Sequence, residues 1–284
     1  MKVIRGANEM RAWSLDQKGQ SKSVGFVPTM GALHEGHLSL MRASVQDCSV
    51  SVASIFVNPT QFAPHEDFDA YPRTFESDSA MCAEVGIDAI YAPKASDMYP
   101  EGYATYVAVE RLTDGLCSRT RPHFFRGVAT VVTKLFNAVL PDRAYFGQKD
   151  AQQCAVITRM ARDLDMGIEI VEMPIVREAD GLAMSSRNRY LSEGDRARGL
   201  CLSRSLFAAQ EQLERGERDA ATIIAAVRKG MRGVDIDYVE LVDAASMQPV
   251  ERVQAPVLLA VAAQVGAARL IDNIKFEPND KPQA

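Results

Sequence analysis

Histidine and cysteine are scarce in this chain of 284 residues, which contains four histidines and five cysteines. The cysteines form no close pair and are spread over the chain as Cys48, Cys82, Cys117, Cys154 and Cys201. This spacing favours neither a zinc site nor a disulfide framework, so we expect reduced thiols and a cytoplasmic location. Long apolar runs are also missing, because the longest, residues 255–268, is too short to cross a bilayer as a helix. The first ten residues lack the apolar centre of a signal peptide.

Basic residues are not in excess either, since the formal net charge is -5. Proteins that bind nucleic acid usually present a basic face, so nucleic acid is not an expected partner, although a local basic pocket stays open. A content of 47% hydrophobic and 24% charged residues is ordinary for a globular protein. The length predicts one large or two modest domains. Neither nucleic acid nor a membrane is an expected partner.

The first part of the chain alternates apolar, strand-like stretches with helical ones. Strands are expected at 23–29, 49–59, 87–93, 143–147 and 167–176, and helices at 36–47, around 78–86, at 127–141 and at 150–165. Strands that are apolar throughout, with helices between them, indicate a parallel sheet covered on both faces. The sequence therefore predicts an α/β fold with a doubly wound, Rossmann-like parallel sheet over residues 1–175.

The pattern changes near residue 176. Residues 177–192 are polar and loop-like, and helical segments follow at 193–215 and 220–231. Strand-like pieces with short links come next, at 235–244, 257–265 and 268–276. We expect residues 176–284 to form a smaller α+β domain, with a polar tail at 277–284 that is disordered.

The stretch PTMGALHEGHLSL, residues 28–40, holds two of the four histidines, His34 and His37. It follows a predicted strand and precedes a predicted helix, which places it at the edge of a parallel sheet where ligands bind. The amino end of the helix favours an anion, and imidazoles there can donate hydrogen bonds to phosphate. A turn with a capping histidine is the alternative for a single histidine. Zinc is less favoured, because metalloproteases place two histidines four residues apart.

Three further segments carry polar residues next to predicted strands or on a loop. Asn58 and Gln61 follow the second strand, and Lys149 with Asp150 lies between a strand and a helix. The stretch GLAMSSRNRY places Ser185, Ser186 and Arg187 on the polar loop, where hydroxyls and a guanidinium suit an oligophosphate. Taken singly, each segment has an ordinary alternative: a turn, a solvated loop, or a serine cap beside a surface arginine.

Taken together, in this order and spacing, the segments PTMGALHEGH, SIFVNPTQF, YPRT, FGQKDAQQ and DGLAMSSRNRYL resemble the pantothenate synthetase (pantoate–β-alanine ligase) family. Residues 34–37 are similar to the H-x-G-H signature of the nucleotidylyltransferase superfamily. The resemblance implies an ATP-dependent ligase that makes pantoyl adenylate from pantoate, releases pyrophosphate, and then forms pantothenate and AMP with β-alanine. It also implies ATP as a substrate, Mg²⁺, a cytoplasmic enzyme of pantothenate biosynthesis and a homodimer.

The resemblance assigns roles to residues that match the family's motifs. His37, His34, Lys149 and Arg187 correspond to catalytic positions, with His37 as the donor to the reacting phosphate. Gln61 and Gln153 match the glutamines that bind pantoate, with Asn58 beside them, and Mg²⁺ is expected near Asp150. The positions that match ATP-contacting segments are Met30, Gly31, Ala32, Leu33, His34, Glu35, Gly36, His37, Gly147, Gln148, Lys149, Asp150, Val176, Met184, Ser185, Ser186 and Arg187.

One segment departs from the family pattern. The chain reads RPHFFRGV at 121–128, so the family's histidine position falls on Phe124 and a histidine stands one place earlier, at His123. Either the loop brings the His123 imidazole to the family position, or Phe124 occupies it and His123 faces solvent. We favour the first arrangement, because a loop has no fixed side-chain period and a shift of one residue costs little.

Two other functions stay open at this point. A nucleotidyltransferase of the same superfamily would keep AMP on its product, whereas a ligase releases free AMP. A catalytically weakened nucleotide-binding protein would bind ATP without turning it over, and the change at Phe124 is the reason to consider it.

Overall fold

The computed structural model describes residues 1–63 and 66–278. The chain forms two compact units. Unit 1 comprises Met1–Val109, Arg121–Gln148 and Val156–Val176, and unit 2 comprises Glu110–Thr120, Lys149–Ala155 and Arg177–Ala284. The expected disorder of the tail 277–284 concerns mainly 279–284, which lie outside the described residues.

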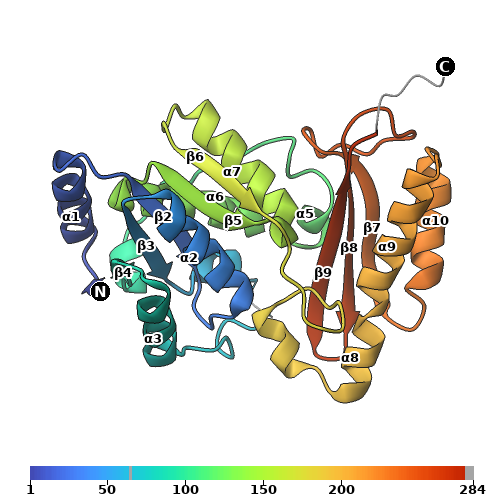
Figure 1. Cartoon of the computed structure of the whole chain (residues 1–284), viewed down its shortest axis with the longest axis horizontal. Coiled ribbons are helices and arrows are strands. Elements are labelled where there is room, and N and C mark those ends of the chain that lie inside the picture. The colour runs from blue at the N-terminus through green and yellow to red at the C-terminus, as the bar shows by residue number, and fades with distance from the viewer. Residues whose placement is uncertain (64–65, 279–284) are drawn as a thin grey trace. The chain divides into compact units, whose positions relative to one another are not determined.

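Unit 1 contains a sheet of six strands (Figure 1). They are β1 (Lys2–Ile4), β2 (Val24–Thr29), β3 (Val50–Ile55), β4 (Ala89–Tyr91), β5 (Arg143–Gly147) and β6 (Glu169–Met173). Their order is β1-β4-β3-β2-β5-β6, and every neighbouring pair is parallel. The predicted α/β class with a doubly wound parallel sheet is confirmed.

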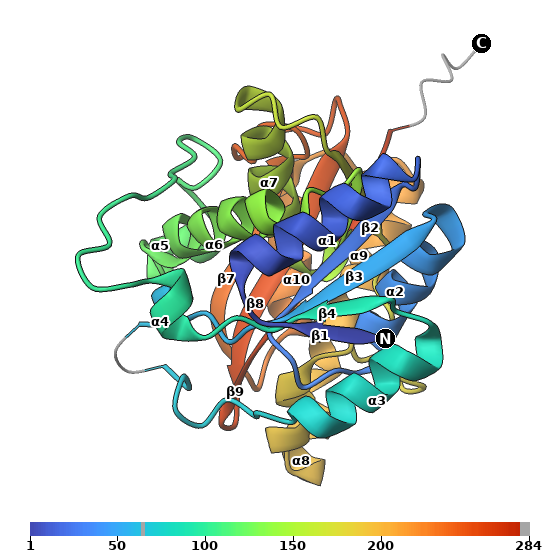
Figure 2. The same ribbon diagram turned by 90° about the vertical axis from the view of Figure 1, so that its left-hand side faces the viewer.

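Helices cover both faces of this sheet (Figure 2). On one face lie α1 (Ala7–Gly19), α6 (Phe124–Val139) and α7 (Ala151–Asp163), and on the other lie α2 (Glu35–Asp47) and α3 (Phe75–Val85). Short helices also form at α4 (Ala95–Met98) and, in unit 2, at α5 (Cys117–Thr120). The sequence analysis missed β1 and α1, since α1 buries only Met10 and Ser14 and so carries almost no apolar periodicity.

The strand order reverses between β2 and β5. β2 pairs with β5 on one side and with β3 on the other, and both pairs are parallel. The segments that follow these three strands therefore lie at the same edge of the sheet. In folds of this kind, ligands bind at the edge where the order reverses. The segment after β2 contains His34, and the segment after β3 contains the short helix η1 (Pro59–Gln61).

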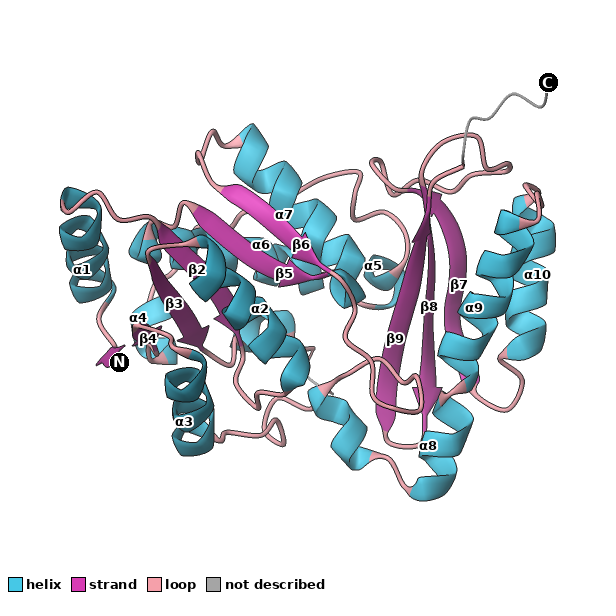
Figure 3. Cartoon of the chain, viewed as in Figure 1, coloured by secondary structure: helices cyan, strands magenta, loops and turns pink. Residues whose placement is uncertain are grey.

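Unit 2 contains an antiparallel sheet with the order β7-β8-β9, built from β7 (Asp235–Asp243), β8 (Val257–Val265) and β9 (Ala268–Phe276). Helices α9 (Cys201–Glu214) and α10 (Ala220–Gly230) lie side by side and pack against this sheet (Figure 3). The helix expected at 193–215 is instead two helices, α8 (Glu193–Gly199) and α9. The division falls after Gly199, a residue of low helix propensity, which packs against the sheet.

Replacing Gly127 by alanine is expected to lower the free energy of unfolding by about 1–3 kcal/mol, because the added Cβ has no space. It would lie 2.3 Å from the carbonyl oxygen of Thr60, which belongs to η1. Gly19→Ala is the matched control, since a Cβ at Gly19 meets nothing within 4 Å and should leave stability unchanged or slightly higher. Urea unfolding measures both, and equal stabilities for the two variants would contradict this packing.

Candidate active site

The segment between β2 and α2 turns through two residues with left-handed backbone, Gly31 with φ of 82° and Ala32 with φ of 50°. Glycine adopts this conformation at little cost, whereas alanine adopts it only where neighbouring contacts hold it. A Cβ at Gly31 would also lie 3.0 Å from a carboxylate oxygen of Asp78 and 3.2 Å from Ile55. Conformation and space therefore both require glycine at position 31.

The two histidines meet at the start of α2, where His34 is the N-cap residue. The His37 amide donates to the His34 carbonyl at 2.8 Å, and the ring centroids are 4.1 Å apart. Both residues are half-buried. Glu35 between them is exposed and forms an ion pair with Arg42, which lowers the pKa of the Glu35 carboxyl. Two imidazoles thus stand together at the positive end of a helix, with the neighbouring carboxylate paired to a cation.

Two other predicted site residues lie close to this segment within unit 1. The Gln61 side-chain amide donates to the Met30 sulfur at 2.9 Å. Its oxygen accepts a hydrogen bond from Asn58 at 3.0 Å. Asn58 is only 1% exposed, and its side chain also donates to the Gly127 carbonyl and accepts from the Tyr99 hydroxyl. Asn58 therefore fixes the orientation of Gln61 beside Met30.

The segment that departs from the family pattern has His123 exposed, at the N-cap of α6. Phe124 is half-buried, with the Arg121 guanidinium 3.9 Å from its ring centroid. Arg121 in turn donates twice to the Glu66 carboxylate, at 2.6 Å each. The arrangement that we favoured from the sequence, with the His123 imidazole turned inward, is wrong. The Arg121–Phe124 stack holds the aromatic ring and leaves the histidine on the surface.

In unit 2, Lys149 is held at both its backbone and its side chain. Its carbonyl accepts a hydrogen bond from the Asn273 side chain at 3.0 Å, and its ammonium lies 3.4 Å from Asp150. Asp272, next to Asn273, is buried and binds the Arg177 guanidinium at 2.7 and 2.9 Å. Burial raises the pKa of Asp272, and Arg177 opposes that rise. These contacts anchor the lysine segment to strand β9.

The loop with the predicted phosphate-binding residues of unit 2 ends in the short helix η3 (Ser186–Tyr190). The Ser185 hydroxyl accepts a hydrogen bond from the Arg187 amide at 3.2 Å, so this serine caps η3. Met184, Ser186 and Arg187 are half-buried, as are Val176 at the end of unit 1 and Gln153 in α7.

Three buried polar residues beside these segments were not predicted. They are Asp78 in α3, Gln152 in α7 and Asp272 in β9. The Gln152 amide donates to the carbonyls of Leu112 and Gly115, and so fixes the segment 110–120 within unit 2. For Asp272 the available signal was a carboxylate on a strand rich in apolar residues, since such a group is buried only where partners satisfy it. Asp78 and Gln152 have polar neighbours in the sequence and gave no such signal.

Comparison with known proteins decides the family. The family model of pantoate-beta-alanine ligase matches residues 2–275. A pantothenate synthetase of Heliobacterium modesticaldum is 53% identical over 98% of this chain and 100% of its own length. A pantothenate synthetase 1 of Bradyrhizobium diazoefficiens is 54% identical over 96% and 98%. This chain belongs to the pantoate-beta-alanine ligase family.

Solved structures of the family have the same fold. A pantothenate synthetase from Thermus thermophilus is 43% identical, with a TM-score of 0.91, over 96% of this chain and 99% of that one. A pantoate-beta-alanine ligase from Francisella tularensis, complexed with beta-gamma ATP and beta-alanine, is 28% identical, with a TM-score of 0.79, over 98% and 100%. The Rossmann-like sheet with a small antiparallel second sheet is therefore the family's architecture. Within the described residues, no helix is long and apolar enough to cross a membrane.

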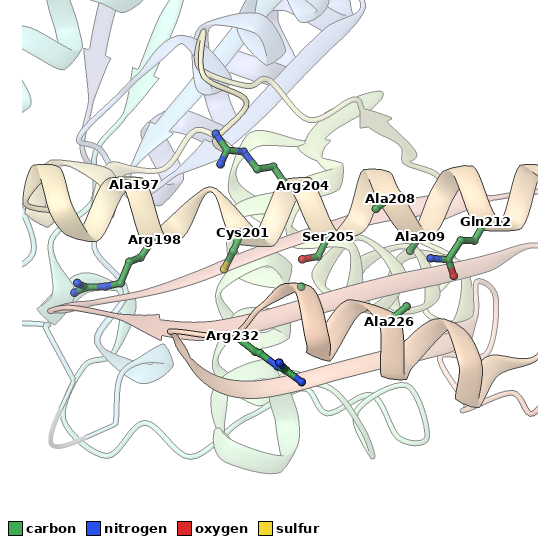
Figure 4. Close-up of a pocket in the computed structure, with 11 residues that line it drawn as sticks. Ala197, Arg198, Cys201, Arg204, Ser205, Ala208, Ala209, Gln212, Ala226 and Arg232 are labelled. Atoms are coloured by element: carbon green, nitrogen blue, oxygen red, sulfur yellow. The ribbon is translucent and has the colours of Figure 1, made fainter.

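A groove of about 390 Å³ lies on unit 2 between α9 and α10 (Figure 4). Small side chains such as Cys201 and Ser205 line it, and the Arg204 guanidinium points away from it. Its lining includes none of the described residues that match the family's motifs. The groove is therefore separate from the candidate active site.

Replacing Arg177 by methionine is expected to destabilise the protein more at pH 8 than at pH 5. The change strips the buried Asp272 carboxylate of its partner, which costs about 3–5 kcal/mol. The folded-state pKa of Asp272 then lies still further above its unfolded value, so protonation of the folded state restores stability as the pH falls through that pKa. Urea unfolding at several pH values measures the effect.

Arg215→Met is the control for that experiment, because Arg215 forms an exposed ion pair with Glu211 in the same unit. Its effect on stability should be small at every pH, since exposed pairs contribute little. A loss from Arg177→Met that is the same at pH 5 and pH 8 would contradict the view that Asp272 is left as a buried charge.

Proposed function

We propose that the chain joins pantoate to β-alanine through a pantoyl adenylate. A pantoate carboxylate oxygen attacks the α-phosphorus of ATP, and the bond from that phosphorus to pyrophosphate breaks. The β-alanine amine then attacks the acyl carbon, the bond to AMP breaks, and the amine loses a proton. The observation that carries this proposal is the pair His34 and His37 at the start of α2, 4.1 Å apart, at the edge where the strand order reverses.

Because two anions must meet in the first step, catalysis rests on positioning and on neutralising negative charge. His37 donates a hydrogen bond to the reacting phosphate, and His34 acts beside it. Lys149, Ser185, Ser186 and Arg187 bind the phosphates that leave. The capped η3 supports this role for the serines, since it fixes the loop that carries them.

Pantoate has hydroxyls and a carboxylate, which amides bind without adding charge. We assign this task to Gln61 and Gln153. The contacts of Gln61 with Asn58 and Met30 support the assignment, because they orient its amide next to the histidine segment. Asn58 then acts through Gln61, since its own side chain is buried and engaged.

We also propose that Mg²⁺ enters with ATP. The described residues contain no group of three or more histidine, cysteine or acidic side chains that could hold a metal by themselves. That fits Mg²⁺, which commonly takes one or two carboxylates and completes its shell with phosphates and water. We assign this role to Asp150, whose side chain is 41% exposed beside Lys149. Bound there, the ion would neutralise charge on the pyrophosphate.

Two further proposals concern the setting of the enzyme. We infer a homodimer formed through unit 1, where Tyr106 is 44% exposed with the Arg126 guanidinium 3.9 Å from its ring centroid. An exposed aromatic–arginine pair is typical of interface residues. We infer a cytoplasmic location, which the five free cysteines support.

The proposed order of steps predicts pantoate-dependent exchange of labelled pyrophosphate into ATP in the absence of β-alanine. The first step is reversible and needs no amine. Adding β-alanine should give free AMP and pantothenate in equal amounts. Overall turnover without any exchange would rule out a freely reversible adenylate, and a product that keeps AMP would mean a transferase.

His37→Ala is expected to lower the rate of pyrophosphate exchange roughly ten- to a hundredfold. The variant loses one hydrogen bond to a charged group, and such a bond contributes ~1.5–3 kcal/mol. The melting temperature should change little. His123→Ala is the matched control, because His123 is exposed at the N-cap of another helix in the same unit and should keep the wild-type rate. Wild-type exchange in His37→Ala would refute its role, and a large fall in melting temperature would make it structural.

A further inference from the structure

The carboxylate of Asp78 is buried at 1% exposure beside the segment that carries the histidines. One of its oxygens accepts the backbone N–H of Ala32 at 3.0 Å, and the other accepts the N–H of Leu33 at 2.9 Å. The hydroxyl of Thr74 donates a third hydrogen bond, at 3.1 Å. A charged side chain is buried to this extent only where hydrogen bonds satisfy it. Asp78 therefore binds the loop, although 45 residues separate it from Leu33.

The N-cap side chain of helix α3 binds the Asp78 carboxylate instead of capping its own helix. Thr74 is its N-cap, and a threonine there usually accepts a hydrogen bond from an amide in the first turn. Among the described residues, the Thr74 hydroxyl makes no such cap bond and donates to Asp78 instead. Asp78 itself lies in the first turn of α3, where the helix end stabilises a negative charge. The helix start is thus organised around the carboxylate and the loop it binds.

The loop is held in a conformation that it would not adopt freely. Gly31 and Ala32 both have left-handed backbone, and α2 begins soon after them, at Glu35. Successive amides in such a turn point toward one anion, as they do in phosphate-binding loops. Here the anion is an internal carboxylate, so the amides of Ala32 and Leu33 are occupied.

We propose that Asp78 is a positioning residue for the ligase reaction, with its buried carboxylate setting the turn that aims His34 and His37. This role rests on the proposed functions of the two histidines. Asp78 does not touch the substrates. It fixes Ala32 and Leu33, and through them the start of α2 and the ring pair.

The test is Asp78→Asn, which keeps the shape of the side chain but not its two acceptors. An asparagine has one carbonyl oxygen, so its NH₂ group must face a backbone N–H. Losing one charge-assisted hydrogen bond corresponds to roughly a tenfold effect or more. We expect kcat for pyrophosphate exchange to fall tenfold or more, and KM for pantoate to stay within about twofold. A lower kcat with an unchanged KM is expected when the histidines are wrongly oriented. A loss of folded protein would instead lower only the apparent enzyme concentration, and active-site titration corrects for that.

Asp142→Asn is the matched control. Asp142 accepts the N–H of Val24 at 2.7 Å, at the other end of the same strand β2, and also pairs with Lys18. Its replacement removes the same kind of contact, a carboxylate on a backbone N–H, but at the start of β2 rather than in the loop that follows it, so stability should fall while kcat stays within about twofold. A second control readout is the amide proton signals of Ala32 and Leu33, which should move upfield and exchange faster in Asp78→Asn but not in Asp142→Asn.

Each outcome is decisive. An active wild type with unchanged kcat in Asp78→Asn would overturn the role of Asp78 and leave the proposed function standing. A wild type with neither exchange nor pantothenate formation would overturn the proposed function itself. If Asp78→Asn does not fold, Thr74→Val carries the test, because it removes one of the three hydrogen bonds and keeps the shape. A fall of several-fold in kcat supports the role, and an unchanged kcat overturns it.

Discussion

Where the chain continues beyond a buried strand, its backbone N–H groups no longer pair with a neighbouring strand and are still shielded from water, so they need acceptors from the protein. This constraint organises unit 1. After β2, the amide of Gly31 donates to the Thr29 hydroxyl, and the next two donate to Asp78. Helix α2 then begins, with His34 as its N-cap residue. The place of the histidine pair therefore follows from hydrogen bonds made by its neighbours.

A carboxylate near a site for ATP would repel its phosphates unless its charge were compensated. The two units meet this requirement with different partners. In unit 1, two amides, a hydroxyl and the start of α3 surround Asp78. In unit 2, the guanidinium of Arg177 pairs with Asp272, whose neighbour Asn273 holds the carbonyl of Lys149. In unit 1 the compensated carboxylate itself fixes the histidine segment, whereas in unit 2 the asparagine next to the carboxylate fixes the lysine segment. Rigid support of this kind keeps catalytic groups in place.

The sequence predicted the parts of the fold that depend on local pattern. Apolar runs located five of the six parallel strands, and the motif at 28–40 led to the histidine pair. Helix α1 was not predicted, because only two of its side chains, Met10 and Ser14, are buried. The contact of Asp78 could not be predicted, because it joins two distant segments through a side chain that reads as part of an ordinary first helical turn. His123 was misplaced for the same reason, since the Arg121–Phe124 stack depends on the partner at Glu66.

The proposed mechanism depends above all on the activation of pantoate as an adenylate before the amine enters. Pantoate labelled with ¹⁸O in its carboxylate reports on this step, with mass spectrometry of both products after a single turnover with ATP and β-alanine. The adenylate route predicts that one labelled oxygen leaves on the phosphate of AMP, because the bond that breaks lies between the acyl carbon and that oxygen. AMP without label, alongside pantothenate that keeps both labelled oxygens, would contradict the mechanism.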